Sequence, residues 1–186
     1  MLPRSSLTLP IVLLLLFLGA SATARGEAAG SVRVLSPQLR AIAEDGLTMS
    51  KTLQELVQRL DASDVVIYLT CAQTEVPQAR SFDGKLRFLS AAGNVRYVVA
   101  HVNCRLSREE QTALLGHELR HAVEIADDES VVDIRTFGRC FARIGFLVAR
   151  DGPRVTYDTD AARGAQRAVQ HDLRSARSAV SGTREK

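Results

Sequence analysis

The chain has 186 residues, a formal net charge of +3 and 46% hydrophobic residues. This length suits a single domain that can bury a core of its own. The small net charge gives no argument for a nucleic-acid partner or for an anionic membrane.

The N-terminus has the pattern of a secretory signal peptide. Arg4 precedes an apolar run over residues 11–18, and small residues follow over 20–24. The pattern predicts a signal peptide over 1–24 and a flexible segment over 25–33. The protein would then be secreted or periplasmic, with no membrane span after cleavage; an uncleaved N-terminal anchor is the alternative.

Two helices and three strands are predicted in the first half of the remaining chain. Pro37 follows Ser36 at a position typical of a first helical turn, and Gly46 is expected to break that helix. The turn residues 91–94 indicate a hairpin between the last two strands. The expected ranges are 37–46 and 48–61 for the helices, 64–70, 86–89 and 95–102 for the strands, and 72–83 for a loop.

The second half is predicted to be mainly helical. Ser107 and Glu110 form a capping box, which starts a helix that should end near 126–128. The later elements are expected to be a helix over about 129–149 stopped by 151–153, an extended piece over 155–157, a helix from Thr159 or Asp160 to about 176, and a disordered tail over 178–186. The fold class is therefore expected to be α+β, a single domain over 34–177 with about three strands in a small mixed or antiparallel sheet.

Three cysteines are present, and in an exported protein two of them can form a disulfide. Cys71 and Cys104 both fall at ends of predicted strands, so we expect them to pair. Cys140 lies in an apolar helical pattern, which favours a buried thiol.

The segment His117-Glu118-Leu119-Arg120-His121 reads H-E-x-x-H within a predicted helix. Residues four apart share one helix face, so both imidazoles can bind one metal ion. The carboxylate of Glu118 is then placed to act on a water molecule as general base. This pattern favours a zinc-dependent hydrolase, and the alternative is a solvated helix face that carries two histidines.

A catalytic zinc site needs a third protein ligand. Glu124 shares the helix face of His121, but it would point parallel to the histidines, which favours a supporting role beside a ligand or a solvated one. Glu129 follows the helix end, where the chain can turn back, and is our expected third ligand. A carboxylate at that place also stabilises a helix N-terminus, so the cap and the ligand remain equal alternatives.

These motifs resemble the gluzincin branch of the zincin metallopeptidases, which carry H-E-x-x-H on one helix and Glu-x-x-x-Asp on the next. The resemblance implies a zincin-like fold in which His117, His121 and Glu129 bind zinc and Glu118 is the general base. It also implies that Asp133 hydrogen-bonds a ligand imidazole. The gap between His121 and Glu129 is much shorter than in the thermolysin-like enzymes.

The expected activity is that of a metallopeptidase that uses Zn²⁺ to cleave a peptide or protein substrate. In zincins the edge strand of the sheet lies beside the cleft and pairs with extended substrate, and we expect residues 95–102 in that place. Tyr157 and His101 are candidate donors to the reacting oxygen, with core packing and strand surface as their simpler roles. The alternative function is an exported binding or envelope-interaction protein on a zincin-like scaffold whose metal site is inactive or structural.

Overall fold

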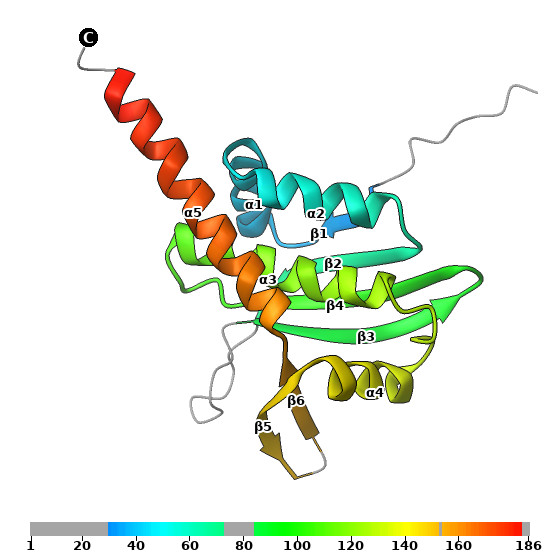
Figure 1. The fold of residues 1–186 in the computed structure, drawn as a ribbon. Coiled ribbons are helices and arrows are strands. Elements are labelled where there is room, and N and C mark those ends of the chain that lie inside the picture. Colours follow the sequence, from blue (N-terminus) through cyan, green and yellow to red (C-terminus); the bar gives the residue numbers. More distant parts are fainter. Residues whose placement is uncertain (1–29, 73–83, 153, 184–186) are drawn as a thin grey trace, which may run out of the picture.

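The computed structural model describes residues 30–72, 84–152 and 154–183. The expected signal peptide, most of the segment 25–33, nearly all of the loop 72–83 and residues 184–186 lie outside these ranges. The described part is an α+β fold (Figure 1). Its elements are β1 (Val32–Val34), α1 (Pro37–Met49), α2 (Lys51–Asp61), β2 (Val65–Cys71), β3 (Gly84–Ala92), β4 (Val95–Val102), α3 (Arg108–Ala126), α4 (Ile134–Ile144), β5 (Phe146–Asp151), β6 (Arg154–Asp158) and α5 (Asp160–Thr183).

The main sheet is mixed and has the strand order β1-β2-β4-β3. β1, β2 and β4 run parallel, and β3 pairs antiparallel with β4 as the expected hairpin. The hairpin turn contains Gly93 at φ 57°, a conformation that glycine adopts at little cost. The fourth strand, β1, was expected to be flexible; it forms because Val32 pairs with Ile67, a partner far away in the sequence.

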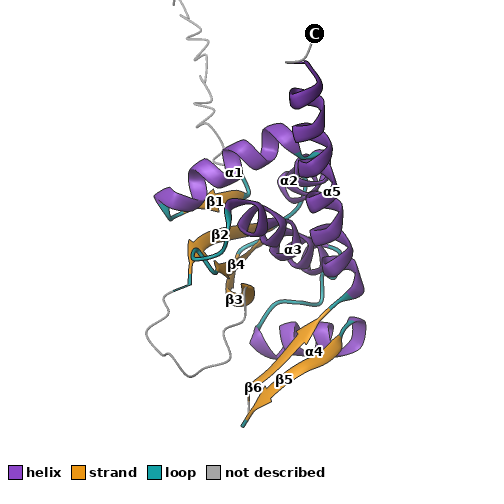
Figure 2. Ribbon diagram, turned by 90° about the vertical axis from the view of Figure 1, so that its left-hand side faces the viewer, coloured by secondary structure: helices purple, strands orange, loops and turns teal. Residues whose placement is uncertain are grey.

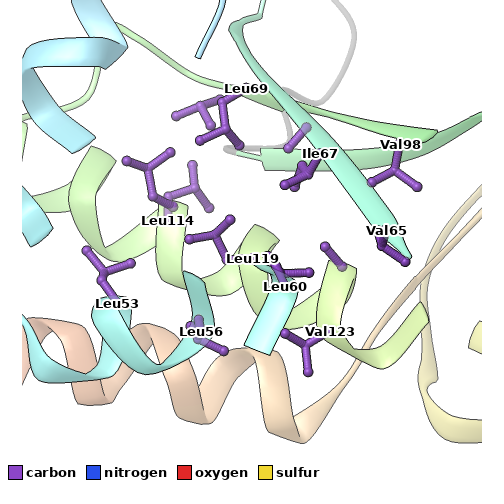
Figure 3. Close-up of a cluster of buried hydrophobic side chains, with 14 of the residues drawn as sticks. Leu53, Leu56, Leu60, Val65, Ile67, Leu69, Val98, Leu114, Leu119 and Val123 are labelled. Atoms are coloured by element: carbon purple, nitrogen blue, oxygen red, sulfur yellow. The ribbon is translucent and has the colours of Figure 1, made fainter. Parts of the chain in front are cut away.

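Helices cover one face of this sheet, with α3 at the centre (Figure 1). Nearly every residue of α3 from Gln111 to Ile125 is buried. Leucines of α2 and α3 meet valine, leucine and isoleucine side chains of β2 and β4 in the core (Figure 3). Gly116 lets α5 approach α3 closely, because a Cβ there would lie 2.6 Å from Val169 Cγ2.

The predicted helix over 129–149 is wrong at both ends. Asp133 caps the N-terminus of α4 by accepting hydrogen bonds from the amides of Arg135 (2.9 Å) and Thr136 (2.7 Å). The helix stops before Gly145, where a Cβ would lie 2.4 Å from the carbonyl oxygen of Asp158. The chain then continues as β5, which pairs with β6 in a two-stranded sheet.

Two other boundaries differ from the prediction. Gly46 does not break α1, because it is buried inside the helix and a Cβ there would lie 2.7 Å from Thr112 Cγ2. The expected disordered tail is helical as far as Thr183. Among the described helices, none combines the length and the apolar character needed to cross a membrane.

The structure joins Cys71 and Cys104 in a disulfide, as expected from their places at the strand ends. Cys140 is a buried free thiol. The disulfide ties the end of β2 to the segment between β4 and α3.

Candidate metal centre

His117 and His121 project from one face of α3. Their Nε2 atoms lie 3.1 Å apart, and the rings meet edge to face. This is the outcome of i, i+4 spacing on a regular helix. The two nitrogens are therefore close enough to bind one ion.

The third group beside the histidines is Asp158, the last residue of β6. Its Oδ1 lies 3.3 Å from His117 Nε2 and 3.6 Å from His121 Nε2. All three ligand atoms fall within 4.8 Å of one another, and no other such group of His, Cys, Asp or Glu was found in the described ranges. This set can hold a metal ion.

The structure does not bring Glu129 to the histidines. α3 continues beyond His121 to Ala126, and Glu129 follows the C-terminal end of this helix. There Glu129 lines a surface depression with Arg59 and Asn94. Asp133 caps the N-terminus of α4, and the imidazoles hydrogen-bond to Gln166 and Glu124 instead. Two predictions are therefore corrected. They placed Glu129 as the third metal ligand and Asp133 as the hydrogen-bond partner of a ligand imidazole.

Hydrogen bonds fix the outer nitrogen of each imidazole. His121 Nδ1 donates to Glu124 Oε2 (2.8 Å), so Glu124 does stand behind a candidate ligand as considered from the sequence. Glu124 Oε1 accepts in turn from Thr159 Oγ1 (2.7 Å). His117 Nδ1 donates to Gln166 Oε1 (3.1 Å). Such contacts orient a ligand ring and select which nitrogen faces the metal.

Asp158 is held from its other side. Arg163 Nε donates to Asp158 Oδ2 (2.7 Å), and the amide of Thr159 donates to Oδ1 (2.7 Å). The guanidinium group of Arg163 lies over the ring of Phe146, 4.4 Å from its centre. The carboxylate is therefore fixed with one oxygen toward the histidines.

The electrostatics of the cluster favour a positive charge. Burial opposes protonation of His121, but the hydrogen bonds that it donates to the carboxylates of Asp158 and Glu124 outweigh this effect and raise its pKa to about 9. Burial and the neighbouring His121 lower the pKa of His117. Although burial opposes its ionisation, hydrogen bonds from His121 and Arg163 hold the pKa of Asp158 well below its usual range. In the metal-free chain a proton on His121 supplies the positive charge, and a bound cation would take its place.

Glu118 lies on the same helix and is only 2% exposed. Burial raises the pKa of its carboxyl group to about 7. Its Oε2 has no hydrogen-bond partner. Gly84 of β3 covers the carboxylate so closely that a Cβ would lie 2.2 Å from Glu118 Oε1. A buried carboxylate with an unpaired oxygen and a pKa near neutrality is suited to accept and release a proton.

β3, and not β4, is the outer strand on this side of the sheet. The strand over 95–102 was expected at the edge, but it lies between β2 and β3. His101 is on β4 and faces the side of the sheet that α3 does not cover, whereas Tyr157 packs against the core. His101 is not part of the group that could hold a metal ion.

Reasoning from the sequence gave no role at this centre to four of its residues, Asp158, Thr159, Arg163 and Gln166. Asp158 follows the extended piece predicted over 155–157, so an acidic residue at a strand end was the one available signal.

A scan against protein-family models gave no match, and neither did the curated proteins or the solved structures.

Proposed function

We propose that the protein is a zinc-dependent hydrolase that acts on peptide bonds, with His117, His121 and Asp158 as metal ligands and Glu118 as general base. The observation that carries this proposal is the unpaired, buried carboxylate of Glu118 on the same helix as two converging imidazoles. The pattern of two histidines and one carboxylate leaves a fourth position for water, as catalytic zinc sites do.

The residues fit zinc in number and in spacing. Two nitrogens bound to one tetrahedral zinc at about 2.0–2.1 Å lie roughly 3.3 Å apart. The Nε2 atoms of His117 and His121 are 3.1 Å apart. The cluster also prefers a positive charge, as the raised pKa of His121 indicates.

When bound, zinc would lower the pKa of a water molecule and polarise the carbonyl group of the substrate. Glu118 would take a proton from the attacking water and deliver it to the leaving nitrogen. In the metal-free chain burial raises the pKa of Glu118 to about 7, so its carboxyl group can accept and release a proton near neutral pH. Glu124 and Gln166 would hold the two imidazoles in the orientation that binding requires, and Arg163 would do the same for Asp158.

The proposed place for the substrate is the outer edge of β3. The strand has no partner on that side among the described residues, and its first residue, Gly84, touches Glu118. An extended peptide could add to this edge by main-chain hydrogen bonds. The antiparallel outer strand beside an H-E-x-x-H helix supports a zincin-like architecture, but the carboxylate ligand would be Asp158 and not the glutamate of the gluzincin pattern. Export to the periplasm or medium remains part of this proposal, on the N-terminal pattern alone.

Substitution of Glu118 by Gln tests the catalytic role. We expect wild-type protein to hold about one zinc per chain by metal analysis and to cleave a broad peptide library. Glu118→Gln should keep the zinc and lose roughly 10²-fold or more of the rate. Glu129→Gln is the matched control and should change neither quantity. Wild-type protein that binds no zinc, or a Glu118→Gln variant that cleaves at the wild-type rate, contradicts the proposal.

The burial of Glu118 also favours a second candidate, an exported binding protein whose metal is structural. In that case wild-type protein would hold zinc but cleave no peptide in the library. Removal of zinc by a chelator would then lower the melting temperature, as it would for the enzyme, so the peptide library separates the two functions.

A further inference from the structure

Among the charged groups at the candidate metal centre, Arg163 of α5 is the one most open to solvent. α5 begins just after β6 and runs along α3, which carries the two histidines (Figure 2). The side chain of His121 is 7% exposed, and those of His117 and Asp158 are 13% and 15% exposed. The side chain of Arg163, which contacts Asp158, is 44% exposed. A ligand that reaches Arg163 from solvent is then one carboxylate group away from the histidines.

Arg163 uses only part of its guanidinium group within the protein. Its Nε donates to Asp158 Oδ2 (2.7 Å), and its central carbon lies 4.4 Å from the centre of the Phe146 ring. The described residues provide no hydrogen-bond partner for either Nη atom. A guanidinium group carries five N–H donors in a planar fork that matches the two oxygens of a carboxylate. Arg163 therefore keeps donors for an anion while it holds Asp158.

Gln166 offers a further donor beside Arg163. It follows three residues later in α5, so the two side chains lie on one face of the helix. Its Oε1 accepts a hydrogen bond from His117 Nδ1 (3.1 Å), and its Nε2 has no partner among the described residues. Each of the two residues thus fixes a candidate metal ligand with one atom and retains N–H donors on another.

The position of these donors fits the end of a peptide chain. The C-terminal carboxylate carbon lies less than about 4 Å from the carbonyl carbon of the last peptide bond, because only the amide nitrogen and one Cα separate them. A single carboxylate group likewise separates Arg163 from His117, since Asp158 Oδ2 accepts from Arg163 and its Oδ1 lies 3.3 Å from His117 Nε2. A side-chain carboxylate in the substrate would lie further from the bond that is cleaved.

We propose that Arg163 and Gln166 bind the free C-terminal carboxylate of a peptide, and that the enzyme is a carboxypeptidase. This inference rests on the proposed hydrolase function and names its substrate class. The oxygen of a water molecule adds to the carbonyl carbon of the last peptide bond, the C–N bond breaks, and a proton from that water goes to the leaving nitrogen. The products are a peptide one residue shorter and a free amino acid.

Peptide binding tests the proposal without any cleavage. The probe is a pair of N-acetylated trialanine peptides, one with a free C-terminal carboxylate and one with a C-terminal amide. They are titrated by NMR into zinc-free protein, because a bound ion could itself attract the carboxylate. Wild-type protein should bind the free acid about tenfold or more tightly than the amide, since the carboxylate accepts charge-assisted hydrogen bonds. Arg163→Gln should lower this ratio of dissociation constants at least about fivefold.

The matched control is Arg167→Gln, which removes the same charge from an exposed position further along α5. Its ratio should stay near the wild-type value. If Arg163→Gln does not fold, Arg163→Lys carries the test, because it keeps the charge but loses the planar fork, and its ratio should also fall. A wild-type ratio near one, or equal ratios in the Arg163 and Arg167 variants, overturns the proposal.

Cleavage by zinc-loaded wild-type protein distinguishes failure of this inference from failure of the hydrolase function. A peptide library with free C-terminal carboxylates should lose residues from that end, whereas the same library with C-terminal amides should resist. Equal cleavage of both forms, or of amides that end in aspartate, keeps the hydrolase and overturns the carboxypeptidase. If neither form is cleaved although the free acid binds preferentially, the hydrolase function is contradicted and the carboxylate site is supported.

Discussion

At the scale of single residues, the decisive finding is that Asp158 completes the histidine pair. It lies 37 positions after His121 in the numbering, and no local pattern links the two. Glu129 was expected in this role because it opens the next predicted helix and has Asp133 four residues later. The histidine and glutamate positions on the helix could be predicted because they depend only on helical spacing, whereas the third ligand depends on the path of α4, β5 and β6.

Substitution of Asp158 by Asn tests this assignment. Asn keeps the shape of the side chain but removes the negative charge and the preferred oxygen ligand. We expect zinc affinity to fall at least about 100-fold, measured by competition with a chromogenic chelator. Glu129→Gln should leave the affinity unchanged. Equal losses in the two variants, or a loss only in Glu129→Gln, would return the third-ligand role to Glu129.

At the scale of secondary-structure elements, Arg96 of β4 anchors the C-terminus of α3. It is 4% exposed and donates to the carbonyl oxygens of Ile125 (2.7 Å) and Asp128 (2.7 Å). It also makes a two-point contact with Asp64, at 2.7 and 2.6 Å. Carbonyl groups at the end of a helix have no partner within the helix, so one arginine satisfies several of them at once. The helix that carries His117 and His121 is thereby tied to the sheet.

Replacement of Arg96 by Met should lower the free energy of unfolding by about 2–3 kcal/mol. We expect this loss to be smaller than the usual cost of breaking a buried ion pair, because the side chain of Asp64 is 42% exposed and water screens the interaction. Urea denaturation measures it. Arg59→Met is the control, because its contact with Asp127 is exposed on both sides and should contribute less than about 1 kcal/mol. A smaller loss for Arg96→Met than for Arg59→Met would contradict the anchoring role.

The same contact makes stability depend on pH. The hydrogen bond from Arg96 lowers the pKa of Asp64, so the ionised carboxylate stabilises the folded state. This contribution is fully present above the unfolded pKa near 3.9 and is lost as the pH falls through the lower folded pKa. The difference in unfolding free energy between wild-type protein and Asp64→Asn should therefore shrink between pH 7 and about pH 3. A constant difference over that interval would show that the charge of Asp64 has no part in it.

Element boundaries also show where local patterns are insufficient. The capping box at Ser107 and the hairpin at Gly93 were predicted correctly because their signals lie within a few residues. The helix over 129–149 was wrong because Asp133 and Gly145 act through specific contacts, a cap and a close approach to Asp158. Gly46 was read as a helix breaker, yet it is a packing position against Thr112.

At the scale of the whole molecule, the disulfide between Cys71 and Cys104 closes a segment of 33 residues. A crosslink of that length reduces the entropy of the unfolded chain. The variant Cys71→Ala/Cys104→Ala should lose about 3–4 kcal/mol of unfolding free energy, measured by urea denaturation under oxidising conditions. Cys140→Ala is the control for loss of a buried thiol without a crosslink. Equal free energies for wild-type protein and the double variant would exclude a stabilising disulfide.

The distribution of charge is also a property of the whole fold. A net charge of +3 does not show where the charges lie, and the sheet gathers arginines from β1 and β3 on one face. Strands distant in the sequence contribute to that face, so the composition of the chain could not reveal it.

By itself the sequence determined the α+β class, most elements, the cysteine pair and the placement of His117, Glu118 and His121 on one helix. Each of these follows from interactions over a few residues or from simple alternation of apolar positions. Only the tertiary structure decided that Asp158 and not Glu129 faces the histidines, that β3 forms the edge and that Arg33 and Arg87 share one face of the sheet. These features depend on which distant segments pack together, and close packing of the whole core selects that arrangement.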